Sequence, residues 1–131
     1  MVRIVDGDTI HVRMDGRREK VRYIGIDTPQ SVKPGAPVEC FAKRAGAFNR
    51  RLVEGERVRL VTDLEPRDRY GRLLAYVYRV RDGLFVNAEL VRRGYAETLT
   101  VPPNVEHAAE FRRLASAARR GGRGLWSACG S

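Results

Sequence analysis

Cysteine is scarce in this 131-residue chain, and long apolar runs are missing. The two cysteines, Cys40 and Cys129, lie far apart, whereas zinc sites use closely spaced pairs, so the spacing excludes a zinc site. A disulfide between them would indicate an oxidising compartment, and two separate thiols are the alternative. No run of about 18 apolar residues occurs, which excludes a membrane-spanning helix.

A signal peptide is also missing, because the first strand-like run begins almost at Met1. We therefore expect a mature domain from which a leader has been removed. The length fits a single domain over residues 1–131. With 43% hydrophobic and 31% charged residues, the composition is that of a globular protein, which argues against a disordered chain.

Lysine is rare as well, because arginine supplies nearly all of the 25 basic side chains. The net charge is +9 and the isoelectric point is near 10.4. Such a surface attracts polyanions, and nucleic acid is the first candidate. The alternative is a solvated surface whose arginine content reflects codon usage.

Alternating and helical patterns divide the chain into short elements. The predicted strands are residues 4–12, 20–26, 58–62, 73–80 and 84–86, and the predicted helices are residues 41–52, 87–93 and 111–118. Asp15-Gly16 forms a hairpin turn between the first two strands. This order predicts an α+β fold, a five-stranded Greek-key barrel of the oligonucleotide-binding (OB) type with three α-helices.

Polar residues interrupt the strands at a few places and suggest a metal-assisted phosphate site. Asp8 and Asp27 offer carboxylate oxygens, which favour calcium or magnesium over zinc, although each could merely cap a strand end. Arg22 and Arg72 match phosphate oxygens in pairs. Strict alternation points Arg22 away from Asp27, unless the strand bends at Gly25.

The turn before the fourth predicted strand carries further polar groups. In Asp68-Arg69-Tyr70-Gly71-Arg72 we expect Asp68 to bond the backbone of a tight turn, while Arg69 contacts a further phosphate. His11 and His107 each stand without a nucleophile or metal partner in the sequence and are interpreted as structural.

These motifs together resemble the staphylococcal nuclease (thermonuclease) family over essentially the whole chain. The matching segments are Val5–Thr9, Arg22–Pro29, Asp68–Tyr76, Val86-Asn87 with Leu90–Gly94, and Leu125-Trp126. The resemblance implies an OB-fold barrel and an enzyme that cleaves single-stranded DNA and RNA with Ca²⁺, leaving 3′-phosphate ends. We also expect a monomer with no obligate protein partner and no membrane association.

Residue roles follow from the motif positions that this resemblance aligns. The implied metal ligands are Asp8, Asp27 and the backbone carbonyl of Thr28. Asp6 is implied to lie next to these ligands without binding the ion directly. The implied phosphate clamp is Arg22 with Arg72. The cysteine positions resemble a pair that is bridged in some bacterial members, which supports a Cys40–Cys129 disulfide and a secreted or cell-envelope location.

Two departures from the family pattern stand out. Gln30 occupies the position of the glutamate proposed as general base, and an amide cannot accept a proton at useful pH. Such a base contributes about 10²- to 10⁴-fold, so we expect slowed hydrolysis. Nothing in the sequence brings Glu39 to the metal as a substitute. Thr100 and Pro102 replace tyrosines that commonly pack on the nucleotide. Tyr70 and Tyr95 are aromatic alternatives, although both could instead be core or rim residues.

The sequence leaves two alternatives to a nuclease. One is a hydrolytically inactive nucleic-acid-binding module of the same fold, which the loss of the general base at position 30 suggests. The other is a basic barrel that binds RNA without any metal. Asp8, Asp27, Arg22 and Arg72 favour the nuclease, because a binding module has no need of them.

Overall fold

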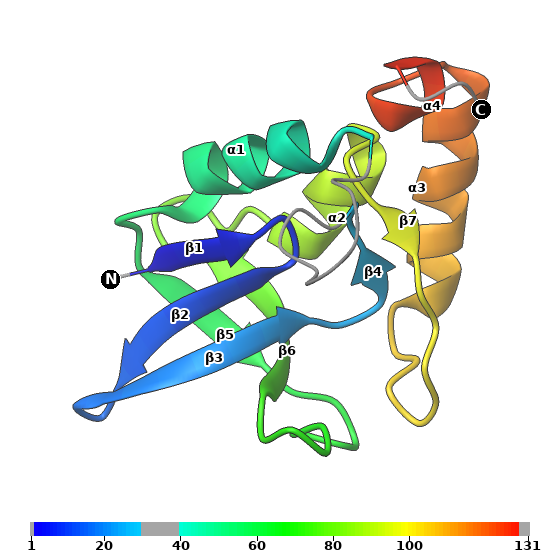
Figure 1. Ribbon diagram of the computed structural model, residues 1–131. Coiled ribbons are helices and arrows are strands. Elements are labelled where there is room, and N and C mark those ends of the chain that lie inside the picture. Colours follow the sequence, from blue (N-terminus) through cyan, green and yellow to red (C-terminus); the bar gives the residue numbers. More distant parts are fainter. Residues whose placement is uncertain (1, 30–39, 129–131) are drawn as a thin grey trace.

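Three consecutive strands form an N-terminal meander in the computed structural model, which describes residues 2–29 and 40–128 (Figure 1). They are β1 (Arg3–Asp6), β2 (Thr9–Met14) and β3 (Arg17–Tyr23). Asp15 and Gly16 join β2 to β3 with φ of 50° and 77°, the conformation of a tight hairpin turn. The predicted strand over residues 4–12 is two strands, because the chain reverses at Gly7 and Asp8.

The sheet continues through a parallel neighbour. The strand β6 (Leu73–Arg79) runs parallel to β3 and pairs on its other side with antiparallel β5 (Val58–Val61), so the order is β1-β2-β3-β6-β5. This five-stranded sheet with helices confirms the predicted α+β fold class. In the described part of the chain no ladder joins β1 to β5, so the sheet is not closed.

A second, two-stranded sheet consists of β4 (Ile26–Asp27) and β7 (Glu97–Thr98). The sequence did not reveal β7, since two residues are too few to show alternation. The predicted strand over residues 84–86 was wrong: Phe85 makes one isolated bridge with Tyr78 and then caps the next helix.

Helices cover one side of the sheet and its end (Figure 1). They are α1 (Ala42–Val53), α2 (Val86–Arg92), α3 (Ala108–Arg120) and α4 (Leu125–Ala128). The first three were predicted, whereas α4 spans a single turn and has no periodicity to detect. No helix in the described ranges is long and apolar enough to cross a membrane.

Two buried asparagines fix the strand ends on which the polar groups lie. Asn49 of α1 accepts a hydrogen bond from Tyr23 Oη at 2.7 Å and donates to the carbonyl of Asp6 at 3.0 Å. Asn87 of α2 donates to the carbonyl of Ile24 at 2.9 Å and accepts from the N–H of Val77 at 2.8 Å. Because a buried polar group left unpaired is costly, these bonds hold the helices and strand ends in one register.

Candidate active site

The turn between β1 and β2 brings a buried carboxylate against Thr28. Asp8 is only 2% exposed, and its Oδ2 atom accepts the backbone N–H of Thr28 at 2.9 Å. Its Oδ1 atom accepts the hydroxyl of Thr9 at 3.0 Å. A Cβ atom on Gly7 would lie 2.6 Å from Thr28 Oγ1, so this close approach requires glycine. Asp6 is also buried and accepts the N–H of Gly7 at 2.8 Å.

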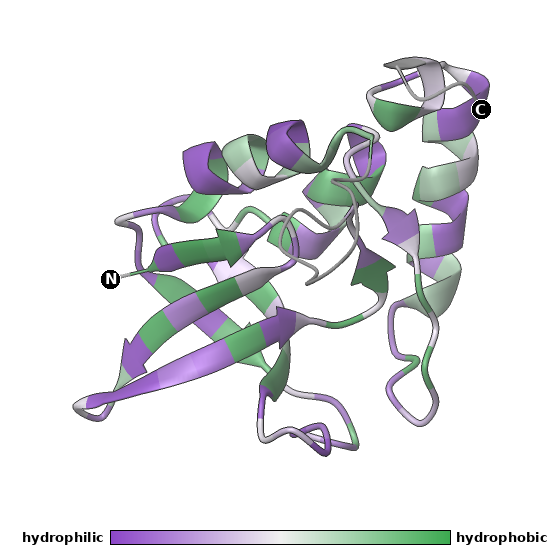
Figure 2. Cartoon of the chain, in the orientation of Figure 1, coloured by the Kyte–Doolittle hydropathy of each residue, from purple (hydrophilic) through white to green (hydrophobic). Residues whose placement is uncertain are grey.

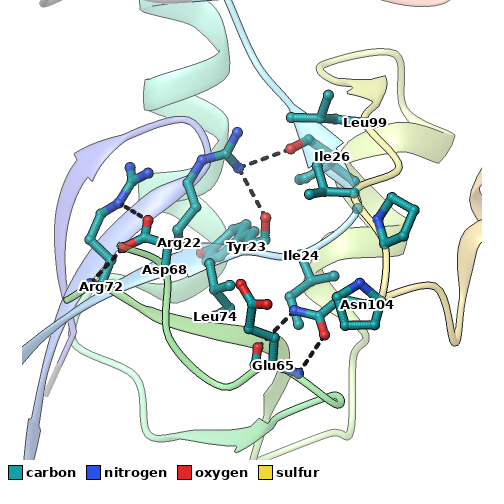
Figure 3. A pocket seen from close by; sticks show the side chains of 14 residues that line it. Arg22, Tyr23, Ile24, Ile26, Glu65, Asp68, Arg72, Leu74, Leu99 and Asn104 are labelled. Carbon is teal, nitrogen blue, oxygen red and sulfur yellow. Dashed lines mark hydrogen bonds and ion pairs between the residues drawn. The ribbon is translucent and has the colours of Figure 1, made fainter. Parts of the chain in front are cut away.

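Arg22 reaches the same place because the chain turns sharply after β3. Gly25 has a φ of 83°, which separates β3 from β4 and cancels the strict alternation that would send Arg22 and Asp27 to opposite faces. The Arg22 guanidinium donates to the carbonyls of Tyr23 and Ile26, both at 2.9 Å (Figure 3). The bend expected near Gly25 is therefore present.

The same guanidinium joins the two predicted metal-ligating carboxylates. Its Nη2 atom lies 3.2 Å from Asp27 Oδ1 and 3.5 Å from Asp8 Oδ2. The Arg22 side chain is 14% exposed and that of Asp27 is 45% exposed, so one carboxylate is buried and the other opens to solvent. The hairpin, the bend and β4 thus bring Asp8, from the first predicted strand, together with Arg22 and Asp27, which the sequence placed along the second.

The donor set fits a hard divalent cation. Asp8, Asp27 and the carbonyl of Thr28 supply only oxygen, and each carboxylate has lone pairs beyond those that accept from Arg22. Within residues 2–29 and 40–128 no three histidine, cysteine, aspartate or glutamate side chains group closely enough to hold a metal. Calcium and magnesium commonly add water or substrate oxygens to such a set of protein ligands.

The turn before β6 is organised by Asp68, as expected. Its Oδ1 atom accepts the N–H groups of Tyr70 and Arg72, both at 3.0 Å, and its Oδ2 atom accepts Arg72 Nε at 2.6 Å (Figure 3). Burial acts to raise the pKa of Asp68, but the hydrogen bonds from Arg72 and Tyr70 outweigh it and hold that pKa below its ordinary value. Asp68 thereby fixes the direction of the Arg72 side chain.

Asp68→Asn is expected to remove part of the acid sensitivity of the fold. A carboxyl with a lowered folded pKa stabilises the protein above its unfolded pKa of about 3.9, and this contribution disappears as pH falls through the folded value. Urea unfolding between pH 2 and 7 should show a smaller loss of stability at low pH in the variant. Asp15→Asn, at the hairpin turn, is the control and should follow the wild type. Identical pH dependence in Asp68→Asn and wild type would contradict the assignment.

A pocket of about 240 Å³ opens between the arginines and the segment after β7. In Figure 3, Arg22 and Arg72 lie on one side of the pocket and Leu99 lies on the other. The apolar lining residues are Leu74, Leu99, Val101, Pro102 and Pro103. The two guanidiniums thus share a pocket whose far wall is apolar. Of the two positions where tyrosines were expected, Pro102 lines this pocket, whereas Thr100 is not among its lining residues.

Asn104 holds the apolar wall in place, a role that sequence reasoning missed. Its Oδ1 atom accepts the N–H of Glu65 and its Nδ2 atom donates to the carbonyl of Glu65, both at 2.8 Å. These partners are 39 residues apart, so no local pattern announces the link. An asparagine directly after two prolines is the single hint in the sequence.

Arg69 and Tyr70 form a separate exposed cluster beside Arg72. Tyr70 is 70% exposed, and Arg69 lies 4.9 Å from the centre of its ring and donates to its hydroxyl at 2.8 Å. Arg72 lies 5.8 Å from the same ring. An exposed aromatic ring with guanidinium groups close to it can stack on a base and contact phosphates.

The remaining predicted residues lie elsewhere or outside the described residues. His107 packs edge-on against Tyr76 at 4.5 Å, an aromatic contact consistent with a structural role. Cys40 is exposed in the turn before α1. The predictions for Gln30, Glu39 and Cys129 concern positions that the structure does not describe.

Comparison with known proteins finds similarity to nucleases. The family model described as "Staphylococcal nuclease homologue" matches residues 20–128. A thermonuclease of Staphylococcus intermedius is 40% identical over 124 residues, covering 95% of this chain and 73% of the relative. A thermonuclease of Staphylococcus hyicus is 36% identical over 97% of this chain and 74% of the relative. Endonuclease YncB of Bacillus subtilis is 38% identical over 98% of this chain and 61% of the relative.

Proposed function

The chain belongs to the staphylococcal nuclease family, and on that premise we propose that it is a calcium-dependent nuclease that hydrolyses single-stranded DNA and RNA to products with 3′-phosphate ends. The observation that carries the proposal is the position of Arg22. Arg22 contacts Asp8 and Asp27 through its guanidinium and also lines the pocket that Arg72 lines. A phosphate bound there would meet two cationic forks beside two carboxylates.

The proposed reaction forms one bond and breaks another. A water oxygen attacks phosphorus while the bond from phosphorus to the 5′ oxygen breaks, so the phosphate stays on the 3′ side and the leaving oxygen takes up a proton. Arg22 and Arg72 stabilise the charge that develops on the phosphoryl oxygens. Bound at Asp8, Asp27 and Thr28, calcium would supply Lewis-acid stabilisation of that charge.

Gln30 limits the rate in this scheme. Its amide can orient the attacking water but cannot accept the proton, which must then pass to solvent. The metal and arginine contributions do not depend on Gln30. We therefore expect an enzyme that is slow rather than inactive.

Release of acid-soluble nucleotide from denatured DNA tests the proposal. Calcium-dependent release should stop in chelator and should fall at least about 10²-fold in Asp8→Asn, because the variant lacks one of two carboxylate ligands. Calcium should also raise the melting temperature of the wild type with nucleotide present, and not that of Asp8→Asn. Absence of release, with salt-sensitive binding of the same DNA, would instead establish the binding module that the loss of the general base suggests.

We extend the proposal to an exported monomer with a Cys40–Cys129 disulfide. In the chain-entropy model a bridge across so long a segment stabilises by about 3–5 kcal/mol. A thiol titration of the unfolded protein should find no free thiol without reductant and two with it. Two free thiols before reduction would overturn the bridge and with it the argument for export.

A further inference from the structure

The outer face of the N-terminal meander carries a row of basic side chains. In the ladders, Arg3 pairs with His11, His11 pairs with Lys20, and Arg13 pairs with Arg18. Residues directly opposite each other on antiparallel strands project to the same face. We call Arg3, His11, Arg13, Arg18 and Lys20 the cationic strip. Figure 2 shows the hydrophilic colour along much of β3 and the hairpin tip.

The opposite face of the same strands is the core side. Ile10, Val12 and Val21 are at most 5% exposed. The only carboxylate of β2 and β3, Glu19, pairs across from Val12 and is held by Arg67 through bonds of 3.0 and 3.1 Å. It therefore cannot neutralise the cationic strip.

Like charges are concentrated on this face without compensation. Among the described residues no ion pair involves Arg3, Arg18 or Lys20. The pKa of His11 is lowered by burial first, and then by the charges of Arg18, Lys20 and Arg3. Like charges placed opposite one another destabilise a sheet, so an anionic partner on this face would stabilise it.

The cationic strip begins at the candidate active site. Arg18, Lys20 and Arg22 alternate along β3 on one face, at steps of about 7 Å. Arg22 pairs with Thr9 in the ladder and contacts Asp8 and Asp27. A strand bound at Arg22 would therefore find two further cations in line, toward the hairpin tip.

We propose that the cationic strip binds the sugar-phosphate backbone of a single-stranded nucleic acid that extends beyond the phosphate held at Arg22. The inference rests on the proposed function for the position of that phosphate. The backbone of the bound strand would run along the paired residues Arg13–Arg18 and His11–Lys20. Because β2 and β3 carry no exposed aromatic ring on which a base could stack, these contacts would be made to phosphate. The strip lengthens the substrate footprint without reading its sequence.

Binding measured in chelator tests the strip without hydrolysis. Fluorescence anisotropy would follow a labelled thymidine trinucleotide and an oligothymidylate of about twelve residues over a range of salt concentrations. The test variant is Arg18→Gln with Lys20→Gln. The matched control is Arg112→Gln with Arg113→Gln, which removes equal charge from the exposed side of α3, away from the hairpin (Figure 1).

For the longer strand, the slope of log K against log salt should decrease by about 1.4 in the test variant, since each lost phosphate contact removes about 0.7. The control slope and the affinity of the trinucleotide should stay unchanged. Equal effects of the two double variants would show a response to net charge only and would overturn the proposal, as would an unchanged slope in both.

The imidazole of His11 gives a second readout in the unmodified protein. A phosphate backbone beside Arg18 and Lys20 offsets their field, so the pKa of His11 measured by NMR should rise with the longer strand and not with the trinucleotide. No change with a saturating longer strand would overturn the strip even if the double variant failed to fold. Neither readout requires hydrolysis. If the protein hydrolyses no nucleic acid but passes both tests, the proposed nuclease activity is refuted while the proposed role of the cationic strip stands.

Discussion

Replacing Arg22 by glutamine should lower the rate of single-stranded DNA hydrolysis by about 10²- to 10³-fold. The Arg22 guanidinium lies within ion-pair distance of both Asp8 and Asp27, and Arg22 lines the pocket, so its loss would remove one of the two proposed phosphate-binding groups. Arg22→Lys should recover little of the rate, because an ammonium cannot reproduce the two-pronged contact. The measurement is kcat with saturating calcium, at a temperature where each variant is folded.

The same substitution should reduce stability. Arg22 satisfies the carbonyls of Tyr23 and Ile26 at the bend and donates to Asp27. Leaving these acceptors without a donor should cost about 1–3 kcal/mol in urea unfolding, measured in chelator. The control Arg112→Gln removes an exposed guanidinium from α3 and should change neither quantity. A fully active Arg22→Gln would show that the phosphate is held elsewhere and would contradict the proposed clamp.

Part of the Arg22 site could be predicted from the sequence. Alternation along β3 assigns Arg22 to one face correctly, but Arg22 and Asp27 meet only because the chain bends at Gly25. Glycine marked that bend as a place where the strand could turn, and a φ of 83° is what the turn requires. The Asp68 turn was likewise predictable, since its bonds all lie within five residues.

Contacts between distant segments were beyond the sequence. At the reversal around Gly7, Thr28 packs closely against the chain. The sequence does not show this contact between distant segments, and the chain around Asp8 looked like one continuous strand. The β4–β7 pair and the Asn104–Glu65 link join segments whose individual patterns are too short to read. These tertiary contacts shape the pocket, which is why its residues were predicted in part and its apolar wall was not.

Gln30→Glu should raise kcat for single-stranded DNA by about 10²- to 10⁴-fold, the usual contribution of a general base. The carboxylate would accept the proton of the attacking water, a function that an amide lacks. Calcium affinity should change little, because Asp8, Asp27 and the Thr28 carbonyl would remain the direct ligands. Hydrolysis assays paired with calcium titrations of melting temperature separate these two quantities.

A shift in pH dependence distinguishes a new base from a general gain in charge or binding. The variant rate should climb as the introduced carboxyl ionises, near its ordinary pKa of about 4.3, whereas the wild-type rate has no such limb from position 30. Gln30→Asn is the matched control, since it keeps an amide and should stay slow. Equal rates in wild type and Gln30→Glu would locate the proton acceptor at another group or in solvent, and would remove the reason for expecting a slow enzyme.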